Sequence, residues 1–243
     1  MKISRLALLL SVIALLLLLA GGPGYRLGLW DLGFGLGGAM RYALYALYAG
    51  AAGAILAIIF LIVPKTRAGS TGLLVAALVI GAAVAAVPVY VRSTAQSLPF
   101  IHDITTDTAN PPEFVEVLPL RADAPNPPEY PGEDVADQQR EAYPEIQPVE
   151  TALTPNAFFE VALEIARQQG WEIVAADATD WRIEATDTTL WYGFKDDVVI
   201  RIGPNNGGSK LDIRSKSRIG GSDLGKNAQR IRAYLQDLEQ RLE

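Results

Sequence analysis

FKDDVVIRIGPNNGGSKLDIRSKSRIGGSDLGKN, residues 194–227, is the stretch that decides the fold of the soluble part of this 243-residue chain. Apolar and polar residues alternate on both sides of the turn-forming run Pro204–Gly208, which predicts two antiparallel strands joined as a hairpin. A glycine-rich segment follows the second strand, and an amphipathic helix is predicted to start at Ser222 or Asp223. We expect the rest of the soluble domain to assemble around this hairpin.

Strand alternation assigns the side chains of the hairpin to two faces. With the turn centred on Asn205-Asn206, the apolar residues of the two strands meet on one face. Asp196 is then opposite Ser215 on that face, and Asp197 is opposite Arg214 on the other. The two adjacent aspartates therefore point in opposite directions. They are not expected to form a carboxylate pair for acid–base catalysis or for holding a metal.

The elements around the hairpin follow a simple order. Thr154-Pro155 is typical of a helix start, with Thr as the N-cap and Pro at the first helical position. Four strand-like runs come next: Trp171–Ala176, Trp181–Thr186, Leu190–Ile202 and Ser209–Ile219. The α-β-β-β-β-α order over residues 151–243 predicts a two-layer α+β domain, with a four-stranded antiparallel sheet and both helices on one face.

Residues 98–150 form a proline-rich and acidic segment, which we call the collar. It contains 12 Asp/Glu against only Arg121 and Arg140. Proline removes a backbone donor, so regular helix and central strand are not expected here. The segment nevertheless carries many apolar residues, including Phe114 and Tyr130. We therefore predict an irregular collar packed against the following domain rather than a pure spacer.

Residues 1–97 are predicted to form a membrane anchor. Three apolar runs predict transmembrane helices at about residues 3–20, 42–63 and 71–91. The first run could instead be a cleaved signal peptide, but Pro23 directly after the small residues favours an uncleaved helix. Ala46, Gly50 and Ala54 have the spacing of small residues that lets helices pack closely, which we expect to operate within the monomer.

Charge is divided sharply between the two parts of the chain. Residues 1–97 hold seven Lys/Arg and one acidic residue, a net of +6, and residues 98–243 hold 14 against 26, a net of −12. Lys2, Arg5, Lys65 and Arg67 favour a cytoplasmic location for the chain start and for the loop between the second and third spans. The acidic domain would then lie on the extracytoplasmic side. Its charge argues against nucleic-acid binding, and the lack of cysteine excludes disulfides and zinc–thiolate sites.

Several motifs resemble those of one known family. They are HDITTD (102–107), QREAYP (139–144), GWEIV (170–174), RIEAT (182–186), FKDDVVIR (194–201) and DIRSKSRIGGSDLG (212–225). Together they are similar to the uncharacterised family numbered 1499 among the domains of unknown function, over roughly residues 98–240. The resemblance implies a bacterial envelope protein in which membrane helices precede the domain. It implies no activity, and no catalytic residue is carried over.

Two groups of polar residues are candidates for function. The first is a polar pocket beneath the last helix, where a buried network is the alternative; it comprises Asp196, Ser215, Ser217, Ser222, Asp223 and Asn227. The second is a charged face that would engage lipid head groups or an acidic partner, or simply be solvated; it comprises Asp197, Arg214, Lys216 and Arg218. No catalytic residue, metal site or cofactor is assigned.

The sequence therefore favours a membrane-anchored extracytoplasmic binding or scaffolding module without enzymatic activity. Its partner would be the bilayer, an envelope polymer or an envelope protein. One alternative is a hydrolytic enzyme that uses Asp196 with Ser215 or Ser217 and Asn227, and this requires an open cleft. Another is an accessory subunit of a larger membrane complex. The ligand, the oligomeric state and the process are not specified by the sequence.

Overall fold

The structure, a computed structural model, describes residues 3–29, 38–63, 65 and 70–242. Lys2 and Arg67, on which the predicted orientation partly depends, lie outside the described residues. The chain divides into two units, one formed by the residues up to Gln96 with Leu190–Gly193, and the other by Ser97–Thr189 with the chain from Phe194 onward.

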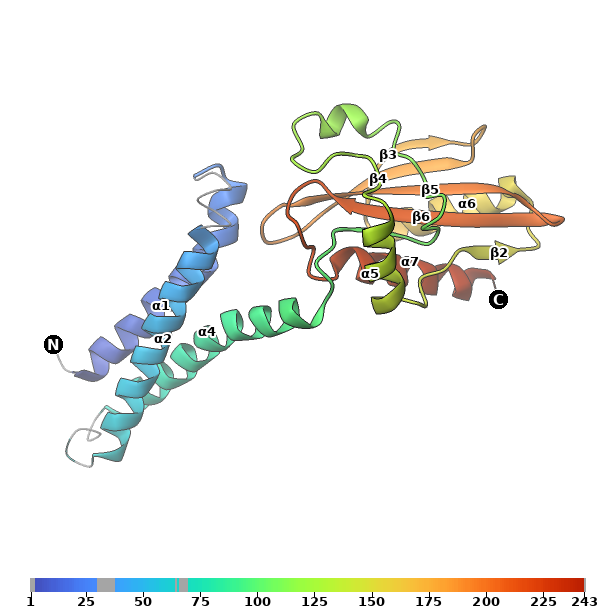
Figure 1. Cartoon of the computed structure of the whole chain (residues 1–243). Coiled ribbons are helices and arrows are strands. Elements are labelled where there is room, and N and C mark those ends of the chain that lie inside the picture. Colours follow the sequence, from blue (N-terminus) through green and yellow to red (C-terminus); the bar gives the residue numbers. More distant parts are fainter. Residues whose placement is uncertain (1–2, 30–37, 64, 66–69, 243) are drawn as a thin grey trace. The chain divides into compact units, whose positions relative to one another are not determined.

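Three helices make up the first part of the chain: α1 (Ile3–Arg26), α2 (Gly38–Ile62) and α4 (Thr71–Ser97) (Figure 1). Each contains a stretch long and apolar enough to cross a membrane, as predicted. All three extend beyond a predicted end: α1 continues through Pro23 to Arg26, α2 begins four residues earlier, and α4 continues to Ser97.

Small residues allow these helices to approach closely. A Cβ atom placed on Gly81 of α4 would lie 2.4 Å from the carbonyl oxygen of Gly50 on α2. Ser11 of α1 donates a hydrogen bond to the Ala77 carbonyl of α4 over 2.8 Å. The predicted use of Gly50 for packing within the monomer is therefore confirmed.

The second part is built on an antiparallel sheet of six strands, so the prediction of four was wrong. The strands are β1 (Asp103–Thr105), β2 (Val149–Thr151), β3 (Glu172–Asp177), β4 (Arg182–Thr188), β5 (Lys195–Asn205) and β6 (Gly208–Ser217). The spatial order is β1-β6-β5-β4-β3, and β2 also pairs with β6. The two extra strands, β1 and most of β2, come from the collar, and both pair with the outer side of β6, at the edge of the sheet. This is consistent with our expectation that the collar contains no central strand.

The central hairpin differs from the prediction in register. Asn205 pairs with Gly208, so the loop is Asn206-Gly207 rather than Asn205-Asn206. Both loop residues have positive φ, 44° and 88°, the conformation for which Asn-Gly is the preferred pair in a two-residue hairpin. The partners consequently shift by two residues, and Asp196 is opposite Ser217 while Asp197 is opposite Lys216. A shift of two preserves the predicted faces.

Two helices cover the face that carries the apolar residues: α6 (Pro155–Gln168) and α7 (Lys226–Leu242) (Figure 1). The Thr154 hydroxyl accepts a hydrogen bond from the Ala157 N–H, which confirms the predicted cap. The hydrophobic core joins both helices to β4, β5 and β6. Its centre includes Phe158, Val198, Ile200, Ile213 and Ile231.

The collar contributes to this core, because Ile101, Ile104, Tyr143 and Ile146 belong to the same cluster. It also contains a regular helix, α5 (Glu133–Ala142), and a 3-10 turn, η2 (Leu118–Arg121). The expectation of no regular helix was therefore wrong for residues 133–142, which contain no proline.

The predicted strand Leu190–Ile202 also begins later than expected. Leu190–Phe194 forms the loop between β4 and β5, and Gly193 in it has a φ of 71°. A left-handed residue at this point interrupts the extended conformation.

Candidate functional site

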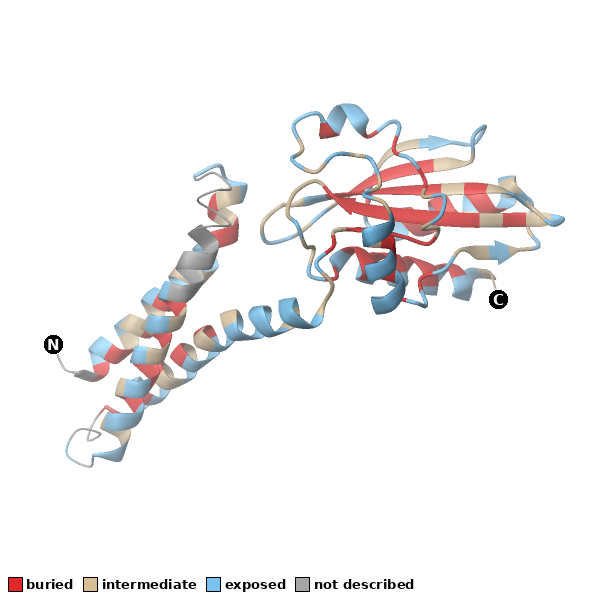
Figure 2. Cartoon of the chain, viewed as in Figure 1, coloured by how far each residue is buried: buried red, intermediate tan, exposed pale blue. Residues whose placement is uncertain are grey.

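The charged face of the sheet is covered, although we expected it to look outward. Asp197 and Lys216 are 0% exposed and Arg214 is 2% exposed. Figure 2 shows the central strands as almost continuously buried, with the collar loop and η2 passing over them. The prediction placed these residues on the correct side of the sheet, but its assumption that this face is exposed to solvent was wrong.

Asp103 on β1 is the first centre of this buried network. Arg214 donates to both of its carboxylate oxygens, through Nε at 2.9 Å and Nη2 at 2.8 Å. Lys216 approaches the same carboxylate at 3.0 Å. Asp103 lies in the collar, so these contacts join the collar to β6.

The same two cations also hold the collar backbone. Arg214 donates to the backbone carbonyls of Pro112 and Pro128 over 3.0 and 2.8 Å. Lys216 donates to the backbone carbonyl of Glu129 over 2.6 Å. The Arg214 guanidinium lies over the Phe114 ring at 4.8 Å from its centroid, a cation–π contact. Every hydrogen bond that Arg214 donates in these contacts therefore goes to a residue of the collar.

Asp197 on β5 is the second centre. Arg121 of the collar reaches it at 2.5 Å, and Arg218 donates to both oxygens at 2.8 and 2.7 Å. Thr186 on β4 donates its hydroxyl to the same carboxylate over 2.7 Å. Arg218 continues to the Leu120 carbonyl, so this centre also fastens η2 to the sheet.

Glu184 on β4 is a third buried carboxylate, and the sequence reasoning gave it no special role. Its two oxygens accept the N–H groups of Val115 and Val117 at 2.9 and 3.0 Å. A carboxylate that accepts backbone N–H groups acts as a fixed acceptor for a loop.

Burial changes the ionisation of groups in the network. It lowers the pKa of Lys216, although Asp103 opposes the shift. Burial, reinforced by the negative charge of Asp103, raises the pKa of Tyr130 to about 12. Both directions follow from taking a charged form out of water.

The predicted polar pocket is a closed cluster on the other face, beneath α7. Asp196 is 3% exposed and accepts a hydrogen bond from Arg230 at 2.7 Å. Ser215 donates to Asn227 Oδ1 at 2.7 Å and accepts from Arg230 at 3.0 Å. Asn227 also donates to Ser217 at 3.0 Å. Four of the six predicted residues therefore meet, and they are paired with one another and with Arg230.

Arg230 was missed by the sequence reasoning. It also binds Asp187 through Nε at 2.9 Å and Nη2 at 2.6 Å, which ties α7 to the end of β4. Its position three residues after Asn227 on a predicted helix was a usable signal, because residues at this spacing share a helix face.

The remaining two pocket residues lie at the start of α7. The Asp223 carboxylate accepts the N–H groups of Gly225 and Asn227, each at 2.8 Å, so it satisfies backbone donors at the start of the helix. Burial raises the pKa of Asp223, against the effect of these two hydrogen bonds. Ser222 accepts a bond from the Leu224 N–H and lies apart from the cluster.

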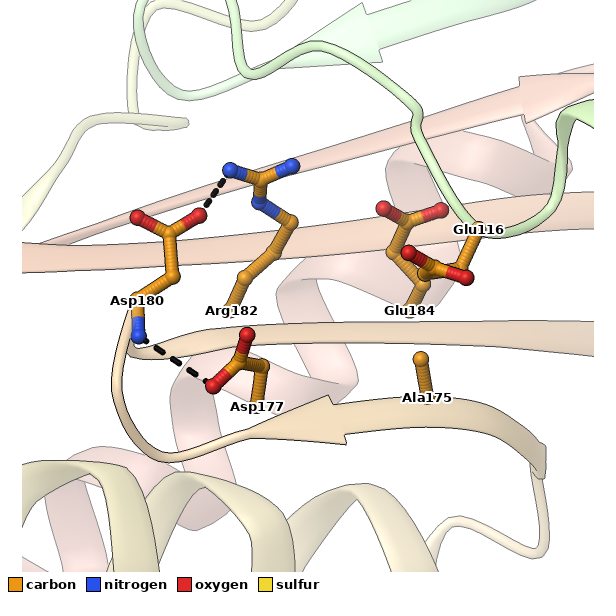
Figure 3. A pocket seen from close by; sticks show the side chains of 6 residues that line it. All are labelled: Glu116, Ala175, Asp177, Asp180, Arg182 and Glu184. Carbon is orange, nitrogen blue, oxygen red and sulfur yellow. Dashed lines mark hydrogen bonds and ion pairs between the residues drawn. The ribbon is translucent and has the colours of Figure 1, made fainter.

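One small pocket lies where the collar passes over β3 and β4 (Figure 3). It is lined by Glu116, Ala175, Asp177, Asp180, Arg182 and Glu184. Three of its four acidic groups are already engaged: Asp180 pairs with Arg182, Asp177 accepts the N–H of Thr179 at 2.8 Å, and Glu184 holds the collar. Among the residues that the structure describes, no group of three or more acidic or histidine side chains is suited to a metal ion.

The chain was compared with sequence models of protein families. The family described as "Protein of unknown function (DUF1499)" matches residues 103–238, more than half of the chain. The match begins at Asp103 and so includes the collar as well as the sheet and both helices. No curated protein matches the chain.

Proposed function

The chain belongs to the family described as protein of unknown function (DUF1499), and from that premise we propose that it is a membrane-anchored binding or scaffolding module without enzymatic activity. In this proposal a bacterial inner membrane holds the three helices, and the folded domain works on the extracytoplasmic side in the cell envelope. Its partner is an envelope protein.

The observation that carries the proposal is the use made of the charged residues. Asp103, Asp197 and Glu184 fasten the collar to one face of the sheet, and Arg230 fastens α7 to the other. The polar chemistry of the domain thus supports a rigid body in which the collar is a fixed part of the surface. The hydrolase alternative loses support, because it needs Asp196 in an open cleft.

The collar then presents the surface on which we propose that a protein partner binds. Val115, Leu118 and Leu120 are exposed on the segment that these ion pairs hold in place. Exposed apolar side chains on a rigid, ordered segment are suited to a protein interface.

Site-specific photocrosslinking in living cells tests this role. A photoreactive amino acid at Leu120 is expected to give a discrete crosslinked product, and the same group at the exposed Ala178 on the β3–β4 turn is the matched control. Crosslinking that is equal and diffuse at the two positions would contradict the proposal. If the crosslinked partner also co-purifies with the chain in stoichiometric amounts in mild detergent, the chain is an accessory subunit of a larger membrane complex.

The proposed side of the membrane has a separate test. The chain contains no cysteine, so an Ala178→Cys variant carries a single reactive thiol. A membrane-impermeant maleimide is expected to label it in intact spheroplasts. Labelling that requires lysis would place the domain in the cytoplasm.

A further inference from the structure

The outer surface of collar residues 113–123 combines apolar and acidic groups. Its exposed apolar side chains are Val115, Leu118 and Leu120. Its exposed acidic side chains are Glu113, Glu116 and Asp123. In the part of the chain that the structure describes, none of these three carboxylates forms an ion pair or accepts a hydrogen bond. The outer surface therefore carries negative charge that the domain itself does not neutralise.

The cations that contact this segment are directed inward. Arg121 is the one cation within residues 113–123, and it is 4% exposed and pairs with buried Asp197. Arg218, which donates to the Leu120 carbonyl, pairs with the same aspartate. Both guanidinium groups are therefore held beneath the segment, and the charge that its outer surface exposes is negative.

The small pocket between the collar and the β3–β4 hairpin adjoins this surface, because Glu116 belongs to both (Figure 3). Four of the side chains that line the pocket are acidic, and Arg182 is its one cation. Glu116 is the acidic lining group that is left without a partner among the described residues. A lysine or arginine from another protein suits such a pocket, because its methylene stem packs against Ala175 while its charge meets Glu116.

The sign of this charge distinguishes among the candidate occupants. A second copy of the chain, docked through the same surface about a two-fold axis, would place acidic groups against acidic groups. Anionic lipid head groups would be repelled in the same way. Residues 98–243 hold 14 Lys/Arg and 26 Asp/Glu, a net of −12, so the rest of the domain adds to both repulsions. A protein surface that carries Lys or Arg around apolar side chains is the complement.

We propose that the outer surface of residues 113–123 binds a basic, amphipathic element of a protein partner, with one Lys or Arg of that element in the pocket beside Glu116. Apolar side chains of the partner cover Val115, Leu118 and Leu120. Charge attraction speeds the association and selects the partner, while burial of the apolar side chains adds affinity. The inference rests on the proposed function, since it names the chemistry of the partner at the same surface.

Photocrosslinking from position 120 of the full chain in living cells, combined with substitutions at Glu116, tests the charge of the partner. Glu116→Lys is expected to lower the yield of the crosslinked product about tenfold, and Glu116→Gln to lower it by a smaller factor. Glu160→Lys is the matched control, because Glu160 is exposed on α6, on the other face of the sheet, and no change in yield is expected. Urea midpoints equal to that of the natural chain verify that the variants are folded.

A second arm examines the partner. Mass spectrometry of the crosslinked product locates the element of the partner that lies against position 120, and this element is expected to contain exposed Lys or Arg. Replacing its cation by Glu is expected to restore the yield in the chain that carries Glu116→Lys, because the two charges are then exchanged.

Equal yields from the Glu116→Lys and Glu160→Lys chains would overturn the inference. A crosslink to lipid or to a second copy of the chain, or a partner variant that fails to restore the yield, would also overturn it. A discrete protein product that is insensitive to Glu116→Lys rejects the basic partner and leaves the proposed function standing. Absence of any discrete product from position 120 rejects the proposed function and the inference with it, so the two failures are distinguishable.

Discussion

Arg214 on β6 and Asp103 on β1 form a two-point ion pair, with N–O distances of 2.9 and 2.8 Å, and neither side chain is more than 2% exposed. The pair joins residues separated by 111 positions in the sequence. Without the collar, the hairpin would have a charged surface on this face. The ion pair makes this surface an internal layer between the sheet and the collar.

Asp103→Asn tests how much this buried charged layer contributes to the stability of the fold. The substitution leaves Arg214 and Lys216 buried beside a neutral group, and we expect the free energy of unfolding to fall by about 3–5 kcal/mol. Urea denaturation of the full chain in detergent micelles, followed by tryptophan fluorescence, measures the change. Asp137→Asn removes an exposed partner of Arg140 and serves as the control, with little change expected. Equal midpoints for the two variants would show that the collar is not held by its charges.

Arg230 makes a second prediction, because it is the cation that neutralises buried Asp196. Arg230→Leu is expected to lower the free energy of unfolding by about 3–5 kcal/mol, since it strands the carboxylate. The double variant with Asp196→Leu should be less destabilised than Arg230→Leu alone, because the buried carboxylate is no longer left without its cation. The urea midpoints of the two variants measure this coupling.

A catalytic role for Asp196 would give a different pattern. Asp196→Leu would then abolish a cellular phenotype while leaving the urea midpoint unchanged. The cluster beneath α7 would no longer be explained by structure alone.

Tyr130 gives a prediction that depends on pH. Its hydroxyl is buried without a hydrogen-bond partner among the described residues, so Tyr130→Phe should preserve or raise stability at pH 8, by up to about 1 kcal/mol. Its pKa of about 12 in the folded state lies above the ordinary value near 10, so the free energy of unfolding is unaffected by its ionisation below pH 10 and falls between about pH 10 and 12, where Tyr130 ionises in the unfolded chain first.

The stability of the Tyr130→Phe variant relative to the natural chain should therefore increase as the pH rises above 10. Lys216, whose pKa burial lowers, shifts stability in the opposite direction, but it is present in both proteins and cancels. Urea midpoints at pH 8 and pH 11 give the comparison. A difference that stays constant with pH would mean that Tyr130 ionises in the folded protein as it does in water.

The faces of the hairpin were predictable from sequence, whereas its pairing was predicted with an error of two residues. Alternation fixes which side chains share a face, and this held for Asp196 and Asp197. The error came from centring the turn on Asn205-Asn206, although Asn206-Gly207 is the better match to a two-residue hairpin. Correct use of the turn rule would have led to the observed register.

The covered face was much harder to predict. It depends on β1, which has three residues, and on collar segments without periodicity that contact strands far away in the sequence. One available signal was Arg121, one of only two cations in an acidic segment, which ends in a buried pair with Asp197. The family resemblance was another, because it started in the collar and so implied that the collar belongs to the domain.

Selective acylation of lysines shows whether the collar seals the charged face of the sheet. The folded full chain is treated with a water-soluble acylating reagent, and modification of each lysine is followed by mass spectrometry. Lys195, on the neighbouring strand, is exposed and reports full reactivity, while Lys216 is 0% exposed. We predict that Lys216 reacts more than about tenfold more slowly than Lys195 in the folded chain and at a similar rate in urea. Equal rates in the folded chain would contradict a sealed face, because Lys216 would then be open to solvent and available for binding.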